Sequence, residues 1–304
     1  MTKAQSPTEA GILAFLATCD AFYPADAVNA TITEQRGYYD ALCAQFSPPL
    51  PEGMSTEDRM VEARIPVRWY RPVAVSTDTV LLYLHGGGFV VGSLESHHAI
   101  CGEIAAAVGA VLVAVDYRLA PEHVWPAAFD DSFAVLASLI SEGRTVVVIG
   151  DSAGGNLAAG VVLKARDARL VGVTGQALVY PALGGDLISG SYAEMAEAPG
   201  LTTADVRYYR DVYAAPEGHP HAFPLAAADL SGLPPTFITV AYFDPLRDDG
   251  RAYAARLAMA GVEVWFREEP QMVHAWLRAR FMSEGAAAGF AALCAAVARM
   301  ARAG

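Results

Sequence analysis

Short and almost uninterrupted apolar runs recur along the chain and predict buried β-strands. They cover residues 80–84, 111–115, 146–149, 177–180, 236–241 and 262–266. Because these runs do not alternate between apolar and polar residues, we expect strands that are buried on both faces of a mostly parallel sheet. Helical stretches separate them at 100–108, 127–139, 157–168 and 250–259, and a leading hairpin is expected at 60–63 and 65–70. This alternation predicts an α/β fold built on a doubly wound sheet.

Two stretches depart from the alternation. Residues 1–50 have a helical pattern with one apolar stripe, and residues 186–222 form a long insert after the strand that ends at Tyr180. A loop of that length without secondary structure is rare in a compact domain, so we predict helices there, including one over 203–213 that is capped by Thr202 or Thr203. The predicted organisation is a helical segment at 1–50, an α/β body at 51–185 and 223–304, and a second helical segment at 186–222.

Composition narrows the class of protein. Of the 304 residues, 54% are apolar and 18% are charged, which excludes a disordered chain. The net charge of −12 argues against nucleic acid and anionic membrane surfaces as partners. No apolar stretch reaches about 20 residues, so we expect no membrane-spanning helix and no stable membrane association. The most apolar stretch, 285–298, predicts a C-terminal amphipathic helix.

The cysteines and the N-terminal residues indicate which cellular compartment to expect. Four scattered cysteines without a CxxC pair offer neither a disulfide framework nor a zinc site, so we expect a reduced, cytoplasmic setting. Residues 15–19 loosely resemble a lipoprotein cleavage site. The apolar run before them is short and lacks a positive start, so one stripe of a helix is the better interpretation.

Gly150-Asp151-Ser152-Ala153-Gly154 carries the pattern G-x-S-x-G between the apolar run 146–149 and a predicted helix. In this strand–turn–helix context the pattern is typical of a nucleophile elbow, where a strained turn exposes the serine hydroxyl. Both glycines are needed because a side chain would collide with the turn. The alternative is a glycine-rich turn without chemistry. Ser152 is therefore the candidate nucleophile.

A second glycine motif, His85-Gly86-Gly87-Gly88-Phe89, ends the strand 80–84. Lipases and esterases use such a segment to offer backbone N–H groups to an oxyanion, and glycines let the substrate oxygen approach the backbone closely. A phosphate-binding loop is the alternative, but no Lys-Ser/Thr follows and G-x-G-x-x-G is absent. We expect an oxyanion hole, with His85 bracing the loop.

A serine nucleophile needs a general base, which in this fold follows it along the chain after an acid. Of the three histidines after Ser152, only His274 lies beyond the last predicted strand, where a loop can return to the serine. His274 is thus the candidate base. His219 and His221 lie where the insert ends and are expected in a loop or at a rim.

The orienting acid should follow the preceding strand directly. Asp244 stands there, just after the apolar stretch that begins at residue 236. Asp248 is the second candidate, although Asp248 and Asp249 are better placed to cap the next helix.

Taken together, these motifs resemble the hormone-sensitive-lipase-like family (bacterial family IV) of α/β-hydrolase esterases. The resemblance rests on HGGGF at 85–89, DYRLAPEH at 116–123, GDSAGGNLA at 150–158 and DPLRD at 244–248, in the family's order. It implies an α/β-hydrolase fold with a mostly parallel eight-stranded sheet flanked by helices, and a helical cap formed by 1–50 and 186–222. The chain departs from the family where His-Gly-Phe is usual and His274-Ala275-Trp276 stands instead.

The resemblance also implies the site residues. It gives Ser152 as nucleophile, Asp244 as acid and His274 as base, and it gives an oxyanion hole formed by the backbone N–H groups of Gly87, Gly88 and Ala153. Asp116, Tyr117 and Arg118 would form a structural polar network. Five side chains are further candidates for contact with the substrate: Phe89, Tyr192, Met195, Tyr209 and Phe223.

The expected function is that of a serine carboxylesterase acting on neutral esters of short- to medium-chain acyl groups, with no metal or cofactor. An amidase or deacetylase with the same triad is an alternative. A non-catalytic ligand receptor of the same fold is another, but such receptors lose the catalytic histidine. A homodimer is left open.

Charge is concentrated in the two expected cap segments. Residues 1–50 hold two basic and five acidic residues, and residues 186–222 hold two basic and six acidic residues. The segments therefore account for −7 of the net charge of −12. Acidic groups over an entrance would disfavour anionic esters and favour neutral ones.

Overall fold

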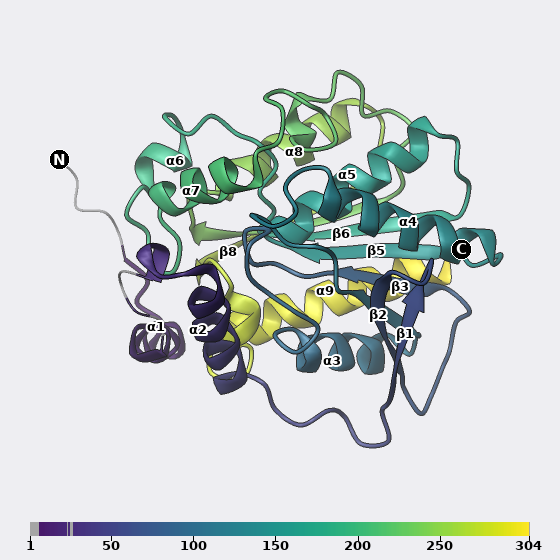
Figure 1. Ribbon diagram of the computed structural model, residues 1–304, viewed down its shortest axis with the longest axis horizontal. Coiled ribbons are helices and arrows are strands. Elements are labelled where there is room, and N and C mark those ends of the chain that lie inside the picture. The colour runs from purple at the N-terminus through teal and green to yellow at the C-terminus, as the bar shows by residue number, and fades with distance from the viewer. Residues whose placement is uncertain (1–5, 23, 25–26, 304) are drawn as a thin grey trace.

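The computed structural model describes residues 6–22, 24 and 27–303, and an eight-stranded sheet crosses its middle (Figure 1). The strands lie in the order β1-β2-β4-β3-β5-β6-β7-β8. β1 and β2 are antiparallel to each other, and β2 is antiparallel to β4, whereas all other neighbours are parallel. The strands are β1 Ser55–Val61, β2 Ile65–Arg71, β3 Val80–Leu84, β4 Leu112–Val115, β5 Val146–Asp151, β6 Val173–Val179, β7 Thr236–Phe243 and β8 Val264–Val273. The predicted α/β fold with a mostly parallel eight-stranded sheet is confirmed.

The central strands form where the apolar runs predict them. Every residue of β3, β4 and β5 is buried, because helices cover both faces of the sheet there. At the two edges the sequence pattern is less informative. We expect β8 over 262–266, but it begins at Val264 and continues to Val273; this stretch includes exposed Arg267 and Pro270, which an edge strand tolerates. β1 begins five residues before the expected hairpin strand and is almost entirely exposed.

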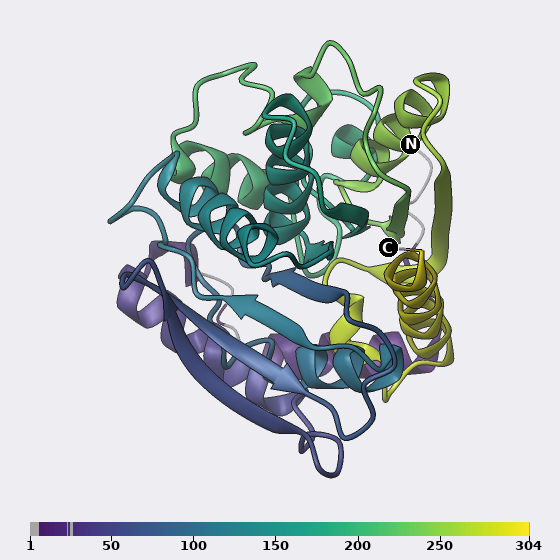
Figure 2. The same cartoon turned by 90° about the vertical axis from the view of Figure 1, so that its right-hand side faces the viewer.

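Helices form one layer on each side of the sheet (Figure 2). One layer contains α3 and α9, and the other contains α4, α5 and α8. The helices span α3 His98–Val108, α4 Ala127–Ser141, α5 Ala153–Asp167, α8 Arg247–Met259 and α9 Glu284–Arg302. Two separate hydrophobic cores result, one on each face of the sheet.

By length and composition, α9 could cross a membrane, and it is the one such helix in the described part of the chain. In the structure it packs against the sheet and against α3, with Leu293 and Val297 fully buried. These contacts are those of the amphipathic C-terminal helix that the sequence predicts.

The two segments outside the strand–helix alternation are helical and lie at one end of the molecule (left in Figure 1). The first contains α1 Ala10–Phe22, the 3-10 helix η1 Ala27–Asn29 and α2 Ile32–Gln45. The second contains α6 Ser191–Glu194 and α7 Thr203–Tyr213. They touch through a hydrogen bond from the Gln35 amide to the Tyr208 hydroxyl (3.2 Å). Thr202 caps α7 in a capping box with Asp205. The exact domain boundaries stay predictions.

The apolar stripe of the first helix is only partly buried. Ile12 and Phe15 are buried in the core that also contains α3 and α9, whereas Phe22, at the end of α1, is 41% exposed. Leu16 and Cys19 are partly buried against the same core, so the stripe leaves the body only at the C-terminal end of α1.

Candidate active site

Ser152 occupies a sharp turn between β5 and α5. Its backbone has φ 55° and ψ −119°, a conformation that few non-glycine residues adopt. A Cβ on Gly150 would lie 2.1 Å from the Gly154 carbonyl oxygen, and a Cβ on Gly154 would lie 2.0 Å from the Leu84 carbonyl oxygen. Both glycines are therefore required sterically, and the turn places Ser152 at the end of a buried strand.

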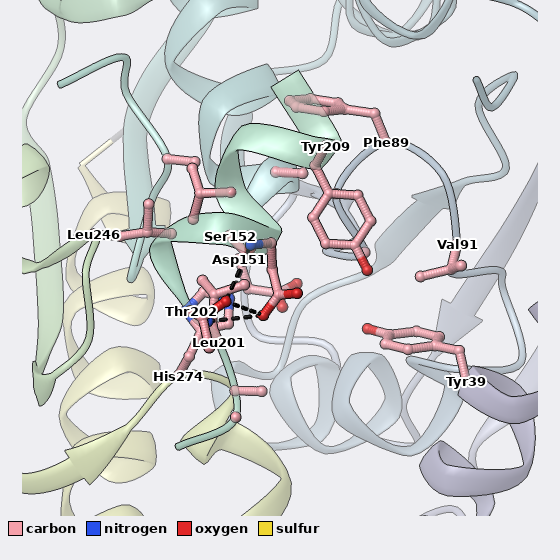
Figure 3. A pocket seen from close by; sticks show the side chains of 18 of the residues that line it. Tyr39, Phe89, Val91, Asp151, Ser152, Leu201, Thr202, Tyr209, Leu246 and His274 are labelled. Atoms are coloured by element: carbon pink, nitrogen blue, oxygen red, sulfur yellow. Dashed lines mark hydrogen bonds between the residues drawn. The ribbon is translucent and has the colours of Figure 1, made fainter. Parts of the chain in front are cut away.

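Three side chains from the ends of three strands form a hydrogen-bonded series, of which Ser152 and His274 are labelled in Figure 3. His274 Nε2 lies 2.9 Å from Ser152 Oγ, and His274 Nδ1 lies 2.7 Å from Asp244 Oδ2. Asp244 is fully buried, and its Oδ1 accepts a hydrogen bond from the Leu246 N–H (2.8 Å). This arrangement holds the imidazole between a carboxylate and a hydroxyl, as a proton-transfer relay requires.

Asp248, the second candidate for the acid, lies elsewhere. Its carboxylate accepts from the Ser191 N–H (2.8 Å) and pairs with Arg251 (2.9 Å). It therefore ties α6 to α8 and does not contact His274 among the contacts that the structure describes.

The segment after His274 shows how the chain accommodates its departure from His-Gly-Phe. β8 itself runs up to Val273, so no long loop is needed to bring His274 to the serine. Ala275 has φ 63°, which a glycine would adopt freely and which costs alanine about 1–2 kcal/mol. Trp276 is fully buried beside Tyr180.

The glycine loop after β3 lies beside Ser152. Gly87 has φ 129° and Gly88 has φ 60°, and a Cβ on Gly88 would lie 2.3 Å from the ring of Tyr209. Among the described residues, the N–H groups of Gly87 and Gly88 have no protein acceptor. Ala153 begins α5, where backbone N–H groups are free of helical partners. Three N–H donors are thus available near the hydroxyl.

A cavity of about 330 Å³ opens over this arrangement, and Ser152 and His274 line it. Of the five side chains predicted to contact a substrate, Phe89, Tyr209 and Phe223 line the cavity (Phe89 and Tyr209 are labelled in Figure 3). Tyr192 and Met195 are not among the described residues that line it. Tyr192 is buried beneath the second segment, where its hydroxyl donates to Asp249 (3.1 Å).

Comparison with known proteins places the chain in a family. A family model described as "alpha/beta hydrolase fold" matches residues 81–278. Carboxylesterase NlhH of Mycobacterium tuberculosis is 41% identical over 251 residues, which are 76% of this chain and 78% of that protein. An arylesterase of Saccharolobus solfataricus is 33% identical over 277 residues, or 84% of this chain and 89% of the relative. The chain belongs to the hormone-sensitive-lipase-like family of α/β-hydrolase esterases.

A solved structure agrees with this assignment. The bacterial heroin esterase is 32% identical and covers 95% of this chain and 98% of its own, with a TM-score of 0.85. The prediction of a serine ester hydrolase is thus confirmed at the level of family and enzyme class.

One residue of this esterase site was not singled out from the sequence. Asp151, directly before Ser152, is buried, and its Oδ1 accepts from the Gly86 N–H (2.9 Å) and from the Tyr83 hydroxyl (2.8 Å). Burial opposes ionisation, but His97, Arg278 and the Tyr83 hydroxyl outweigh it and hold the pKa of Asp151 well below its usual value. An acidic residue at the end of a buried apolar run is a sequence signal that could have identified Asp151 as a residue that holds the glycine loop.

His85 and Tyr117 brace the glycine loop. The Tyr117 hydroxyl donates to the His85 carbonyl oxygen (2.6 Å), and the two rings stack at 4.2 Å. Burial lowers the pKa of His85 to about 3, so the ring is neutral at ordinary pH. Arg118 donates three hydrogen bonds to Asp131, two from its guanidinium (2.8 and 2.9 Å) and one from its backbone N–H (3.1 Å).

The N-terminal segment supplies a wall of the cavity that the sequence did not reveal. Phe15 and Cys19 of α1 and Tyr39 and Leu42 of α2 line it, and so does Arg278 of the 3-10 helix η3 Trp276–Ala279. A helical stripe predicts that such residues face inward, but not that they face a cavity. No described group of three or more His, Cys, Asp or Glu could hold a metal ion.

Proposed function

We propose that this esterase is a carboxylesterase that cleaves neutral esters of short- to medium-chain acyl groups through an acyl-enzyme. The observation that carries the proposal is the hydrogen-bonded series Asp244–His274–Ser152, which ends in a strained elbow beneath a cavity. In this proposal Ser152 is the nucleophile, His274 the general acid and base, and Asp244 the group that orients the imidazole.

In the first half of the reaction, His274 Nε2 takes the proton of Ser152 as Oγ bonds to the ester carbonyl carbon. The resulting oxyanion accepts hydrogen bonds from the N–H groups of Gly87, Gly88 and Ala153, and the N-terminus of α5 adds its favourable dipole. The imidazolium then gives its proton to the alkoxide oxygen as the carbon–oxygen bond breaks. An alcohol leaves and the acyl group stays on Ser152.

In the second half, His274 takes a proton from water as the water oxygen attacks the acyl carbon. Ser152 Oγ leaves and recovers the proton from the imidazolium, and the carboxylic acid is released. Asp244 stays ionised in both halves and stabilises the imidazolium that forms each time. These steps need no metal and no cofactor.

Cavity size and charge support the substrate class. The volume of about 330 Å³ is near the lower end of the roughly 300–1,000 Å³ typical of small-molecule sites. Much of the lining is aromatic or aliphatic, which suits an acyl chain. The acidic residues of the two helical segments disfavour the approach of anionic esters.

The test is Ser152→Ala, assayed on p-nitrophenyl acetate and with a fluorophosphonate probe. We expect turnover to fall to a residual level and labelling to disappear, while thermal unfolding stays close to that of the wild type. Unchanged turnover would refute the assignment of the nucleophile.

Two further assays define the substrate. A series of C2–C12 p-nitrophenyl esters should show kcat/KM highest among the short and medium chains. A comparison with matching anilides separates an esterase from an amidase or deacetylase, and faster anilide cleavage would favour the latter.

A further inference from the structure

Arg278 is a buried cation next to the proposed catalytic groups. It follows His274 by four residues, is 4% exposed and lines the cavity that contains Ser152. Its Nη2 donates to the Tyr39 hydroxyl (2.8 Å), and the guanidinium lies 5.3 Å from the centre of the Tyr39 ring. This part of the cavity wall is therefore positively charged.

The other buried arginines with similar exposure are paired with carboxylates. Arg247 pairs with Glu194, and Arg280 pairs with Glu103 at 2.6 Å. For Arg278, no carboxylate of the described residues lies within ion-pair distance. A buried charge without a counter-charge is costly, so its compensation must come from a group one step farther away.

That group is Asp151, with His97 in between. His97 Nε2 lies 3.4 Å from Arg278 Nη2 and 3.4 Å from Asp151 Oδ1. Burial lowers the pKa of His97, which favours the neutral form of its ring. The cluster of Asp151, His97 and Arg278 therefore carries one negative and one positive charge and no net charge.

We propose that Arg278 is a positioning residue whose charge balances the Asp151 carboxylate, so that an ionised aspartate can hold the oxyanion loop without opposing the oxyanion at Ser152. The proposal rests on the proposed function, because it concerns the oxyanion of the acyl-transfer step.

The physical need for balance follows from the position of Asp151. An ionised carboxylate binds the Gly86 N–H more strongly than a neutral acceptor does, which keeps the glycine loop in place. The same charge, one residue from Ser152, would repel the oxyanion in a site of low dielectric. Arg278 cancels this repulsion while the hydrogen bond to the loop is kept.

Tyr39 gives the N-terminal segment a part in this arrangement. It belongs to α2, its hydroxyl accepts from Arg278, and its ring lies against the guanidinium. The N-terminal segment thereby holds the guanidinium toward His97 and Asp151. Arg278 therefore links the N-terminal segment to the electrostatic environment of Ser152.

The experiment compares Arg278→Met and Arg278→Lys with Arg280→Met, a control at an equally buried arginine that is paired with Glu103. Turnover of neutral p-nitrophenyl acetate is measured, with active sites counted by fluorophosphonate titration. We expect Arg278→Met to lower kcat on the order of tenfold to a hundredfold at nearly unchanged KM. Arg278→Lys should retain more activity than Arg278→Met, and Arg280→Met should keep its kcat per titrated site.

The decisive comparison measures Asp151→Asn alone and the double change Asp151→Asn with Arg278→Met, which removes both charges but keeps an amide oxygen for Gly86. Charge balance predicts that the double variant has a higher kcat and a higher melting temperature than Arg278→Met alone. A kcat equal to the product of the two single losses would overturn the proposal.

Two further results separate charge balance from a folding defect and from direct binding of substrate. If Arg278→Met does not fold, Tyr39→Phe decides: it should lower kcat severalfold without changing KM, and an unchanged kcat would overturn the proposal. If Arg278→Met keeps its kcat on p-nitrophenyl acetate and only raises KM for p-nitrophenyl hydrogen glutarate, Arg278 binds substrate carboxylates and the proposal is wrong. Failure of the fluorophosphonate to label wild-type Ser152 would instead refute the proposed function itself.

Discussion

Asp249 should make the stability of this esterase depend on pH in a direction unusual for an aspartate. It is fully enclosed at the start of α8, and its Oδ2 is the acceptor for four donors. These are the N–H groups of Leu183 (2.6 Å), Gly184 (3.0 Å) and Gly185 (3.3 Å) and the Tyr192 hydroxyl (3.1 Å). The carboxyl group thus ties the cavity-lining loop after β6, and the second helical segment, to α8.

Burial raises the pKa of Asp249 from 3.8 to about 6, in spite of these hydrogen bonds and of nearby Arg210. The folded state therefore holds the proton more tightly than the unfolded state. The stabilisation is fully present below the unfolded pKa near 3.8, is lost as the pH rises through about 6, and stays lost at higher pH. A shift of about two units at about 1.4 kcal/mol per unit corresponds to about 3 kcal/mol.

Asp249→Asn tests this reasoning because asparagine keeps an acceptor oxygen and cannot ionise. Urea unfolding followed by tryptophan fluorescence at several values between pH 4 and 7.5 gives the unfolding free energy of both proteins. We expect the difference, variant minus wild type, to rise with pH by up to about 3 kcal/mol and to level off near pH 7. A constant difference, or one that falls with pH, would refute the reasoning.

Asp248→Asn is the matched control on the neighbouring residue. Burial acts against ionisation of Asp248, but the Ser191 N–H, Arg251 and Arg247 outweigh it and lower its pKa. Its stabilisation is lost only as the pH falls below about 4. The difference between this variant and the wild type should therefore stay flat from pH 5 to 7.5.

Four further predictions concern the site and the fold. Asp244→Asn should lower kcat on the order of 10⁴-fold, while Asp248→Asn should leave most of the activity; the reverse result in steady-state assays would exchange the two roles. Gly154→Ala should abolish soluble, probe-labelled protein, because its Cβ would lie 2.0 Å from a carbonyl oxygen; a normally labelled variant would contradict the geometry of the elbow. Gly37 lies in α2, and no atom lies within 4 Å of the position that a Cβ would take there. Gly37→Ala should therefore raise the free energy of unfolding, measured in urea, by about 1 kcal/mol, and a decrease would contradict this reasoning. At low salt, a monoanionic ester should be hydrolysed more slowly than its neutral methyl ester. Equal or faster turnover of the anionic ester would refute the argument that the acidic helical segments disfavour anionic substrates.

Much of the fold followed from local pattern. The buried central strands lie within a few residues of the apolar runs, because both faces of a parallel sheet need apolar side chains. The edge strands of the sheet were predicted less accurately. β1 is almost entirely exposed, and β8 continues past its apolar run through charged residues and Pro270. Neither stretch carries an apolar strand pattern, so pairing with β2 and β7 places them in the sheet.

For the site, too, local motifs could be found from the sequence, whereas contacts between distant residues could not. Ser152 and the two glycine motifs were found by sequence because steric demands of a tight turn act on consecutive residues. Asp244 could be preferred to Asp248 only by its place after the strand, and the structure shows that its carboxylate is the one that reaches His274 (2.7 Å). The cavity walls could not be assigned in this way: Tyr192 fits an aromatic lining by composition yet is buried under its own segment.

The sequence by itself therefore determined the strand–helix order, the elbow, the glycine loop and the order of the serine, the acid and the histidine. These features depend on backbone sterics and on hydrophobic periodicity, which act over a few neighbouring residues. Only the tertiary structure decided that Tyr39, His97, Asp151 and Arg278 form one cluster and that the N-terminal helices wall the cavity. The reason is physical: the charge of a buried group is balanced by whatever the packing brings near it, and here packing joins residues that lie far apart along the chain.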